Sequence, residues 1–323
     1  MTATKPEMRP TGFAHRLARW IDWIVVALIL AVLVVVSVTV TGFLTEYNIS
    51  NLLLQSSYIG ILAIGEAFVL ITGGIDLSSP AIMAMGAVVG AGYIVAHPNQ
   101  LVLGILIMVV IGVACGIVNG LLVAYVKLVP FIATLATSTL LGGLALWITH
   151  SASIAGLPNS FLNLAGSLGS IPIPVIVFAV VIGLSYILLA KTVLGRHIFY
   201  IGVNARAARV ASISVERTQV MAYAISGLSA GIAAVVLTAI LGTATAAMGQ
   251  GTIQLAIISA AVIGGVSIYG GVGSIPGVVL GTLLLTLIGN VMSLNNVSYF
   301  TTYMVKGAVI VVAVSLDRFR RLK

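Results

Sequence analysis

The chain has 323 residues, of which 60% are hydrophobic and only 7% are charged, and its formal net charge is +8. Soluble domains carry about 25% charged residues, so this composition excludes an ordinary water-soluble globular protein. The positive charge does not indicate nucleic-acid binding, because the basic residues gather in short regions between long apolar runs.

Apolar segments of membrane length follow one another along the whole chain. A helix needs about 20 apolar residues to cross the bilayer hydrocarbon. We therefore expect an all-α, polytopic membrane protein with short loops and one transmembrane domain over residues 1–323. About ten spans are predicted, near residues 24–44, 56–73, 79–96, 101–126, 130–149, 174–190, 219–242, 252–268, 275–294 and 299–316.

Two stretches interrupt this pattern. Residues 73–80 and 244–256 are rich in Gly, Thr, Pro and Gln. Such composition predicts broken or re-entrant helices, which membranes tolerate only where the backbone is buried in protein or lines a cavity.

Three basic regions predict the orientation. They are the tail over residues 1–20, the loop over residues 191–218 and the tail over residues 317–323. Because Lys and Arg concentrate on the cytoplasmic side of membrane proteins, we expect all three regions, and hence both termini, to be cytoplasmic. The uncharged stretch 151–170 is then expected outside.

The basic loop contains a predicted short helix. Asn204 is expected to cap it, and Ala207, Ala208 and Ala211 are spaced to form a face of small residues. Such a face suits docking into the groove of a partner, with Arg206 and Arg209 placed to pair with acidic groups at the groove's rim. A solvated basic loop that merely follows the charge rule is the alternative.

Charged and polar residues inside predicted spans are candidate functional residues, because charge at membrane depth is costly unless it is paired or hydrated. Asp76 follows Gly73 and Gly74 and is expected to cap a helix start on the cytoplasmic side, a structural role. Glu66 is expected either to line a translocation path or to form an ion pair that locks helices together. The candidate residues for the path are Glu66, Gln254 and Asn290.

Signatures of catalysis are missing from the sequence. It contains no G-x-x-x-x-G-K-[ST] phosphate loop, no carboxylate pair at catalytic spacing and no Ser/His/Asp constellation. The four histidines are scattered, and the lone Cys115 has no metal-ligand spacing. We therefore expect neither an enzyme nor a bound cofactor or metal.

Several segments together resemble one family. In chain order they are 70–78, 129–135, 194–208, 261–274 and 304–310, which include the strings Leu-Ile-Thr-Gly-Gly-Ile-Asp-Leu-Ser and Val-Pro-Phe-Ile-Ala-Thr-Leu. They resemble the ribose-type permease subunits of bacterial ATP-binding cassette (ABC) importers, in the branched-chain amino acid/ribose permease superfamily, and span residues 50 to 317.

The resemblance implies a subunit of the bacterial inner membrane that carries a small polar solute, with a monosaccharide as the expected one. It implies three kinds of partner: a second permease subunit, identical or paralogous, an extracytoplasmic solute-binding protein and a separate cytoplasmic ATPase. The loop then resembles the helix that couples the permease to the ATPase, and its candidate residues are Gly195, Arg196, Gly202, Asn204, Arg206, Ala207, Ala208, Arg209 and Ala211. For Lys306, the resemblance implies a packed structural cation, and contact with the solute is the alternative.

Two departures accompany the resemblance. Sugar permeases commonly have Glu-Leu-Asp where this chain has Gln254-Leu255-Ala256, and an uncharged residue where it has Glu66. An ion-coupled secondary transporter of a small polar solute, which needs carboxylates inside the membrane, is the alternative function.

Overall fold

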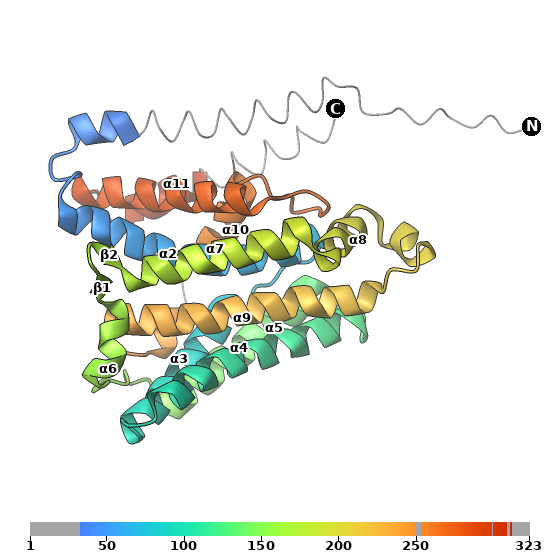
Figure 1. Cartoon of the computed structure of the whole chain (residues 1–323), viewed down its shortest axis with the longest axis horizontal. Coiled ribbons are helices and arrows are strands. Elements are labelled where there is room, and N and C mark those ends of the chain that lie inside the picture. The colour runs from blue at the N-terminus through green and yellow to red at the C-terminus, as the bar shows by residue number, and fades with distance from the viewer. Residues whose placement is uncertain (1–32, 250–252, 299, 309–310, 312–323) are drawn as a thin grey trace, which may run out of the picture.

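In the computed structural model, the described residues are 33–249, 253–298, 300–308 and 311. The long helices run side by side, with α8 at one end of the bundle and α6 and the two short strands at the other (Figure 1). The elements are α2 (Glu46–Ile71), α3 (Ser79–Ala96), α4 (Leu101–Ala124), α5 (Pro130–Thr149), α6 (Asn159–Leu162), η1 (Asn163–Ala165), β1 (Ser167–Leu168), β2 (Ile171–Pro172), α7 (Ile173–Lys191), α8 (Val193–Val210), α9 (Val215–Leu241), η2 (Ala246–Gly249), α10 (Ile253–Ile263) and α11 (Ile275–Leu294).

The structure confirms an all-α polytopic membrane protein. Seven helices within the described ranges are long and apolar enough to cross a membrane, and an eighth candidate span, Ala246–Ile263, includes the undescribed residues 250–252. They correspond to eight of the ten predicted spans. The other two predictions, 24–44 and 299–316, lie only partly within the described residues, which include 33–44, 300–308 and 311 of them, and the tails 1–20 and 317–323 lie wholly outside.

Two features differ most from the prediction. Helix α2 begins at Glu46, ten residues before the predicted start, because Thr45 caps it by accepting a hydrogen bond from the Asn48 backbone N–H. Asn48, in the first turn of this helix, is buried inside the protein and does not mark a loop. The stretch 151–170 also contains more structure than expected, since β1 pairs with β2 in a small antiparallel hairpin.

Helices α2, α3 and α9 form the interior of the bundle. In their most apolar windows, 78%, 67% and 61% of the residues are buried, whereas the corresponding share is 22% in each of α4, α5 and α7. The last three helices therefore turn most of their surface outward.

Small residues allow α4 to cross α9 closely, as expected where helices associate in lipid. Gly112 and Gly116 of α4 lie directly against the backbone of Gly227 and Tyr223 in α9. A Cβ atom at Gly116 would collide with the backbone oxygen of Tyr223.

We predict that Gly116→Ala lowers stability although alanine is the better helix former. The gain in helix propensity is about 1 kcal/mol, but overpacking a tight contact costs typically about 1–3 kcal/mol. Thermal unfolding of the detergent-purified chain should show a lower midpoint. The matched control is Gly183→Ala in α7, where a Cβ atom meets nothing within 4 Å, and whose midpoint should hold or rise. Equal midpoints for the two variants would contradict the close crossing.

Candidate functional site

Two interruptions of the helices meet in the interior. The first separates α2 from α3, where the chain turns at Gly73, with φ of +83°, and stays unwound until α3 begins at Ser79. The second separates α9 from α10. The Gln254 side chain, at the start of α10, donates from Nε2 to the backbone oxygen of Asp76 at 3.0 Å. Both interruptions lie where the sequence predicts broken helices, and this hydrogen bond joins them.

The first interruption turns back into the bundle. Asp76 contacts Glu66, five residues before the end of α2, and Ser226, eleven residues after the start of α9. At 1.5 Å per helical residue, these partners lie about 7 Å and 16 Å inside their helix ends. Asp76 therefore lies within the length of these helices and not at their ends.

The Asp76 carboxylate is completely buried and well supplied with donors. Oδ1 accepts from the backbone N–H of Ser78 at 2.9 Å and from its hydroxyl, and Oδ2 accepts from the Ser226 hydroxyl at 2.7 Å. Ser78 directly precedes α3, so Asp76 binds at a helix start.

Glu66 is completely buried but has fewer donors. Its Oε1 accepts from the Asp76 backbone N–H at 3.2 Å, whereas its Oε2 has no hydrogen-bond partner. Within the described ranges, the salt bridges involve Glu216 and no other acid. The helix-locking ion pair considered for Glu66 is therefore not found there.

A chain of uncharged polar groups extends this cluster to α4 and α5. Asn119 donates from Nδ2 to the Ser78 hydroxyl at 2.7 Å, and Thr137 donates to Asn119 Oδ1 at 2.6 Å. Ser226, Asn119 and Thr137 were not predicted from the sequence, because the prediction weighed mainly the ionisable residues of the spans and took only Gln254 and Asn290 among the uncharged ones. A search for uncharged hydrogen-bonding residues within apolar spans would have found them.

Asn290, a candidate for the path, binds elsewhere in the bundle. Its side-chain amide exchanges two hydrogen bonds with that of Asn48, at 3.1 and 2.7 Å. A further hydroxyl pair, Ser56 with Thr286 at 2.8 Å, joins the same two helices. Asn290 thus lies in a polar contact between α2 and α11.

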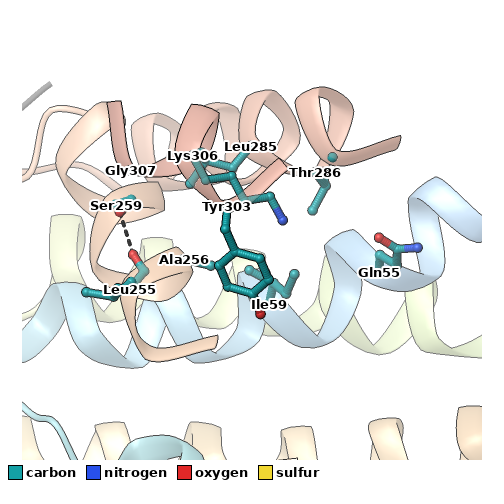
Figure 2. Close-up of a pocket in the computed structure, with 11 residues that line it drawn as sticks. Gln55, Ile59, Leu255, Ala256, Ser259, Leu285, Thr286, Tyr303, Lys306 and Gly307 are labelled. Carbon is teal, nitrogen blue, oxygen red and sulfur yellow. Dashed lines mark hydrogen bonds between the residues drawn. The ribbon is translucent and has the colours of Figure 1, made fainter. Parts of the chain in front are cut away.

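A pocket lies between α2, α10, α11 and residues 303–307 (Figure 2). Its lining includes none of the three path candidates, although Leu255, next to Gln254, belongs to it. Lys306 lines the pocket, half-buried, with its Nζ beside Gly289 and without an ion pair to any acid that the structure describes. The lining residues are Gln55, Ile59, Leu255, Ala256, Ser259, Leu285, Thr286, Gly289, Tyr303, Lys306 and Gly307.

Helix α8 is interrupted where the sequence predicts a helix start. Asn204 leaves the helical conformation, with φ of −161° and ψ of 99°, and its Oδ1 accepts from the backbone N–H groups of Arg206 and Ala207, both at 3.0 Å. The prediction of an Asn204 cap is therefore confirmed.

The three alanines after Asn204 do not share one exposed face. Ala207 and Ala211 are exposed, whereas Ala208 is only 4% exposed and packs with Ile201 and Val215. The single small-residue face is therefore wrong for Ala208, because adjacent helical residues point in different directions. Exposed apolar side chains accompany Ala207 on α8, namely Tyr200, Val203 and Val210.

Four other residues of the basic loop fall into two groups. Gly195 and Gly202 are packed so closely that a Cβ atom would collide with the backbone oxygens of Leu189 and Ile71, respectively. Arg196 and Arg206 are exposed.

Arg209, expected to reach an acid of a partner, binds within the chain. Its Nη2 lies 2.6 Å from Glu216 Oε1, and Lys127 Nζ lies 3.1 Å from the same atom. Glu216 therefore ties the end of α8 to the turn between α4 and α5.

Apolar spans, broken helices and buried polar contacts together define a polytopic membrane permease. The chain belongs to the family described as branched-chain amino acid transport system / permease component, whose model matches residues 48–314.

The chain is similar to named sugar permeases over most of its length. It is 39% identical over 288 residues to the ribose import permease protein RbsC of Bacillus subtilis (strain 168), covering 88% of this chain and 89% of that relative. It is 36% identical over 313 residues to the D-allose transport system permease protein AlsC of Escherichia coli (strain K12), covering 97% and 95%. It is also 36% identical over 301 residues to the L-arabinose ABC transporter permease protein AraH of Azospirillum brasilense, covering 92% and 87%. Comparison with solved structures gave no significant match.

We predict that Ser226→Ala destabilises the protein because it removes a donor from the buried Asp76 carboxylate. Hydrogen bonds to charged groups contribute about 1.5–3 kcal/mol, so the thermal midpoint of the purified chain should fall clearly. The control is Ser229→Ala, also buried in α9, whose hydroxyl makes no hydrogen bond to the described residues. If both variants unfold at the wild-type temperature, Ser226 does not support Asp76.

Proposed function

We propose that this chain is the transmembrane permease subunit of a bacterial ABC importer that moves a monosaccharide across the inner membrane. The observation that carries this proposal is the similarity, over nearly the whole chain, to permeases named for ribose, allose and arabinose. The solute passes through unchanged, and a separate ATPase subunit supplies the energy.

The proposed complex has three further components. A solute-binding protein delivers the sugar from outside, and a second permease subunit, identical or paralogous, completes the pore. The ATPase docks from the cytoplasm onto α8. The exposed apolar residues Tyr200, Val203, Ala207 and Val210 support this docking surface, because water-exposed apolar residues gathered on one short helix are typical of a contact with a partner.

An ion-coupled secondary transporter is the second candidate. The buried pair Glu66 and Asp76 favours it, because such transporters use ionisable residues at membrane depth. Purification of the tagged chain from its own cells distinguishes the two functions. An importer subunit should bring down a separate ATPase with a Walker phosphate loop, and recovery of the chain without any such ATPase would contradict the proposal.

We predict that Ala207→Trp and Ala208→Trp fail in different ways. Ala207 is exposed, so the indole should obstruct the ATPase contact, abolishing transport and weakening co-purification while the membrane level of the chain stays normal. Ala208 is buried in its own chain, where overpacking costs typically about 1–3 kcal/mol, so its variant should lose folded protein.

Arg206→Ala is the milder control at the docking surface, because an exposed ion pair contributes only about 0–1 kcal/mol. Transport assays, membrane levels and ATPase co-purification are measured in parallel for the three variants. Normal transport by Ala207→Trp with the ATPase still bound would show that α8 is merely a basic connection.

We also predict the orientation of the chain. Asn159 begins α6 and Arg206 lies in α8, at opposite ends of the bundle (Figure 1), and the basic residues of the loop favour the cytoplasm. In a Cys115→Ser background, Asn159→Cys should react with a membrane-impermeant reagent added outside intact cells. Arg206→Cys should react only after the membrane is permeabilised. Reporter fusions should place both termini inside, and an externally accessible C-terminus would contradict this orientation.

A further inference from the structure

Two buried oxygens beside Asp76 have no hydrogen-bond donor. They are Glu66 Oε2 and Gln254 Oε1. Both side chains bind the backbone of Asp76. Glu66 accepts a hydrogen bond from the Asp76 N–H, and Gln254 donates one to the Asp76 carbonyl oxygen. A proton on the Glu66 carboxyl would add one donor at a site where both of these oxygens lack one.

The hydrogen-bond donors around the two carboxylates also favour a proton on Glu66. Asp76 is the neighbouring charge, and it accepts from three donors, whereas Glu66 accepts from one. Two buried carboxylates at one site cannot both ionise cheaply without a cation. Of the pair, Glu66 is the less well compensated and is therefore the one that takes up a proton.

No basic group of the described structure, Lys306 included, forms a salt bridge with either carboxylate of the pair. Helices α10 and α11, both packed on α2, carry no ionisable side chain, and Tyr223 of α9 donates its hydroxyl to the Ile75 backbone oxygen. The remaining ionisable residues of α2 and of the helices packed against it are Glu46, Tyr47, Tyr58, Tyr93, Tyr186, Lys191, Arg196, His197, Tyr200, Arg206, Arg209, Glu216 and Arg217.

We propose that Glu66 is a proton-binding site that holds the two helix interruptions together. The proton comes from water and binds the Glu66 carboxylate, which becomes a neutral carboxylic acid. Its O–H donates toward Gln254 Oε1, while its other oxygen keeps the bond from Asp76. Loss of the proton places a second negative charge beside Asp76 and removes this donor. Ionisation of Glu66 therefore weakens the contact between the α2–α3 interruption and the α9–α10 interruption.

Infrared spectroscopy of the purified full chain in lipid nanodiscs tests the proposal without a solute or an ATPase. The chain contains only seven Asp and Glu residues, so the carbonyl stretch of one protonated carboxylic acid can be assigned by substitution. Wild type at neutral pH should show this band, with a shift in D2O. The band should vanish in Glu66→Gln and persist in Glu46→Gln, which changes an exposed residue of the same helix.

Thermal unfolding across a pH series supplies the second readout. If the folded chain binds one proton more than the unfolded chain, its stability falls as pH rises. Wild type should therefore lose thermal stability at alkaline pH relative to Glu66→Gln, whose neutral amide keeps the shape of the protonated acid.

Three outcomes would overturn the proposal. They are a wild-type spectrum without the band, a band that persists in Glu66→Gln, and a Glu66→Gln variant that fails to fold. A sodium site would instead show no band and a sodium-dependent rise in the wild-type midpoint that Glu66→Gln lacks, which also overturns it. Loss of ATPase binding, by contrast, bears only on the proposed transport function.

Discussion

The unwound backbone between α2 and α3 must find its hydrogen-bond partners inside the protein, because membrane hydrocarbon supplies none. Glu66 and Gln254 bind the backbone N–H and oxygen of Asp76, and Ser226 binds its carboxylate. These contacts bring α2, α9 and α10 to one point. The close glycine crossing of α4 on α9 lets Asn119 join the same network through Ser78. The arrangement of the interior therefore follows from the need to satisfy one short irregular segment.

The end of the bundle that carries α8 is in direct contact with the helix that leads to this segment. Ile71, the last residue of α2, accepts a hydrogen bond from the Gly271 backbone N–H at 2.8 Å, and Gly202 of α8 packs against the same carbonyl. Ile71 lies five residues from Glu66. A displacement of α8 by a docked partner would therefore act at the end of α2, close to the helix interruption. These contacts provide a physical route from the docking surface to the interior.

Local chemistry was predictable from the sequence and long-range pairing was not. Apolar length predicted the spans, and Asn204 was recognisable as a cap because its role depends on the next three residues. The early start of α2 was missed because Asn48 resembles a loop residue until Asn290, 242 positions later, is known to pair with it. The division between Ala207 and Ala208 depends on the orientation of α8 against the bundle. The partner of Glu66 is a backbone N–H, which no residue pattern reveals.

Buried carboxylates in an otherwise uncharged interior suit either a structural proton site in an ATP-driven permease or the coupling site of an ion-driven one. Uptake of a labelled monosaccharide into proteoliposomes separates these directly, with the purified permease–ATPase complex in the membrane and the binding protein outside. We expect uptake when ATP is supplied on the side of the ATPase and no ion gradient is imposed. We expect no uptake by the permease alone under an imposed proton or sodium gradient. Gradient-driven uptake without the ATPase would contradict this account.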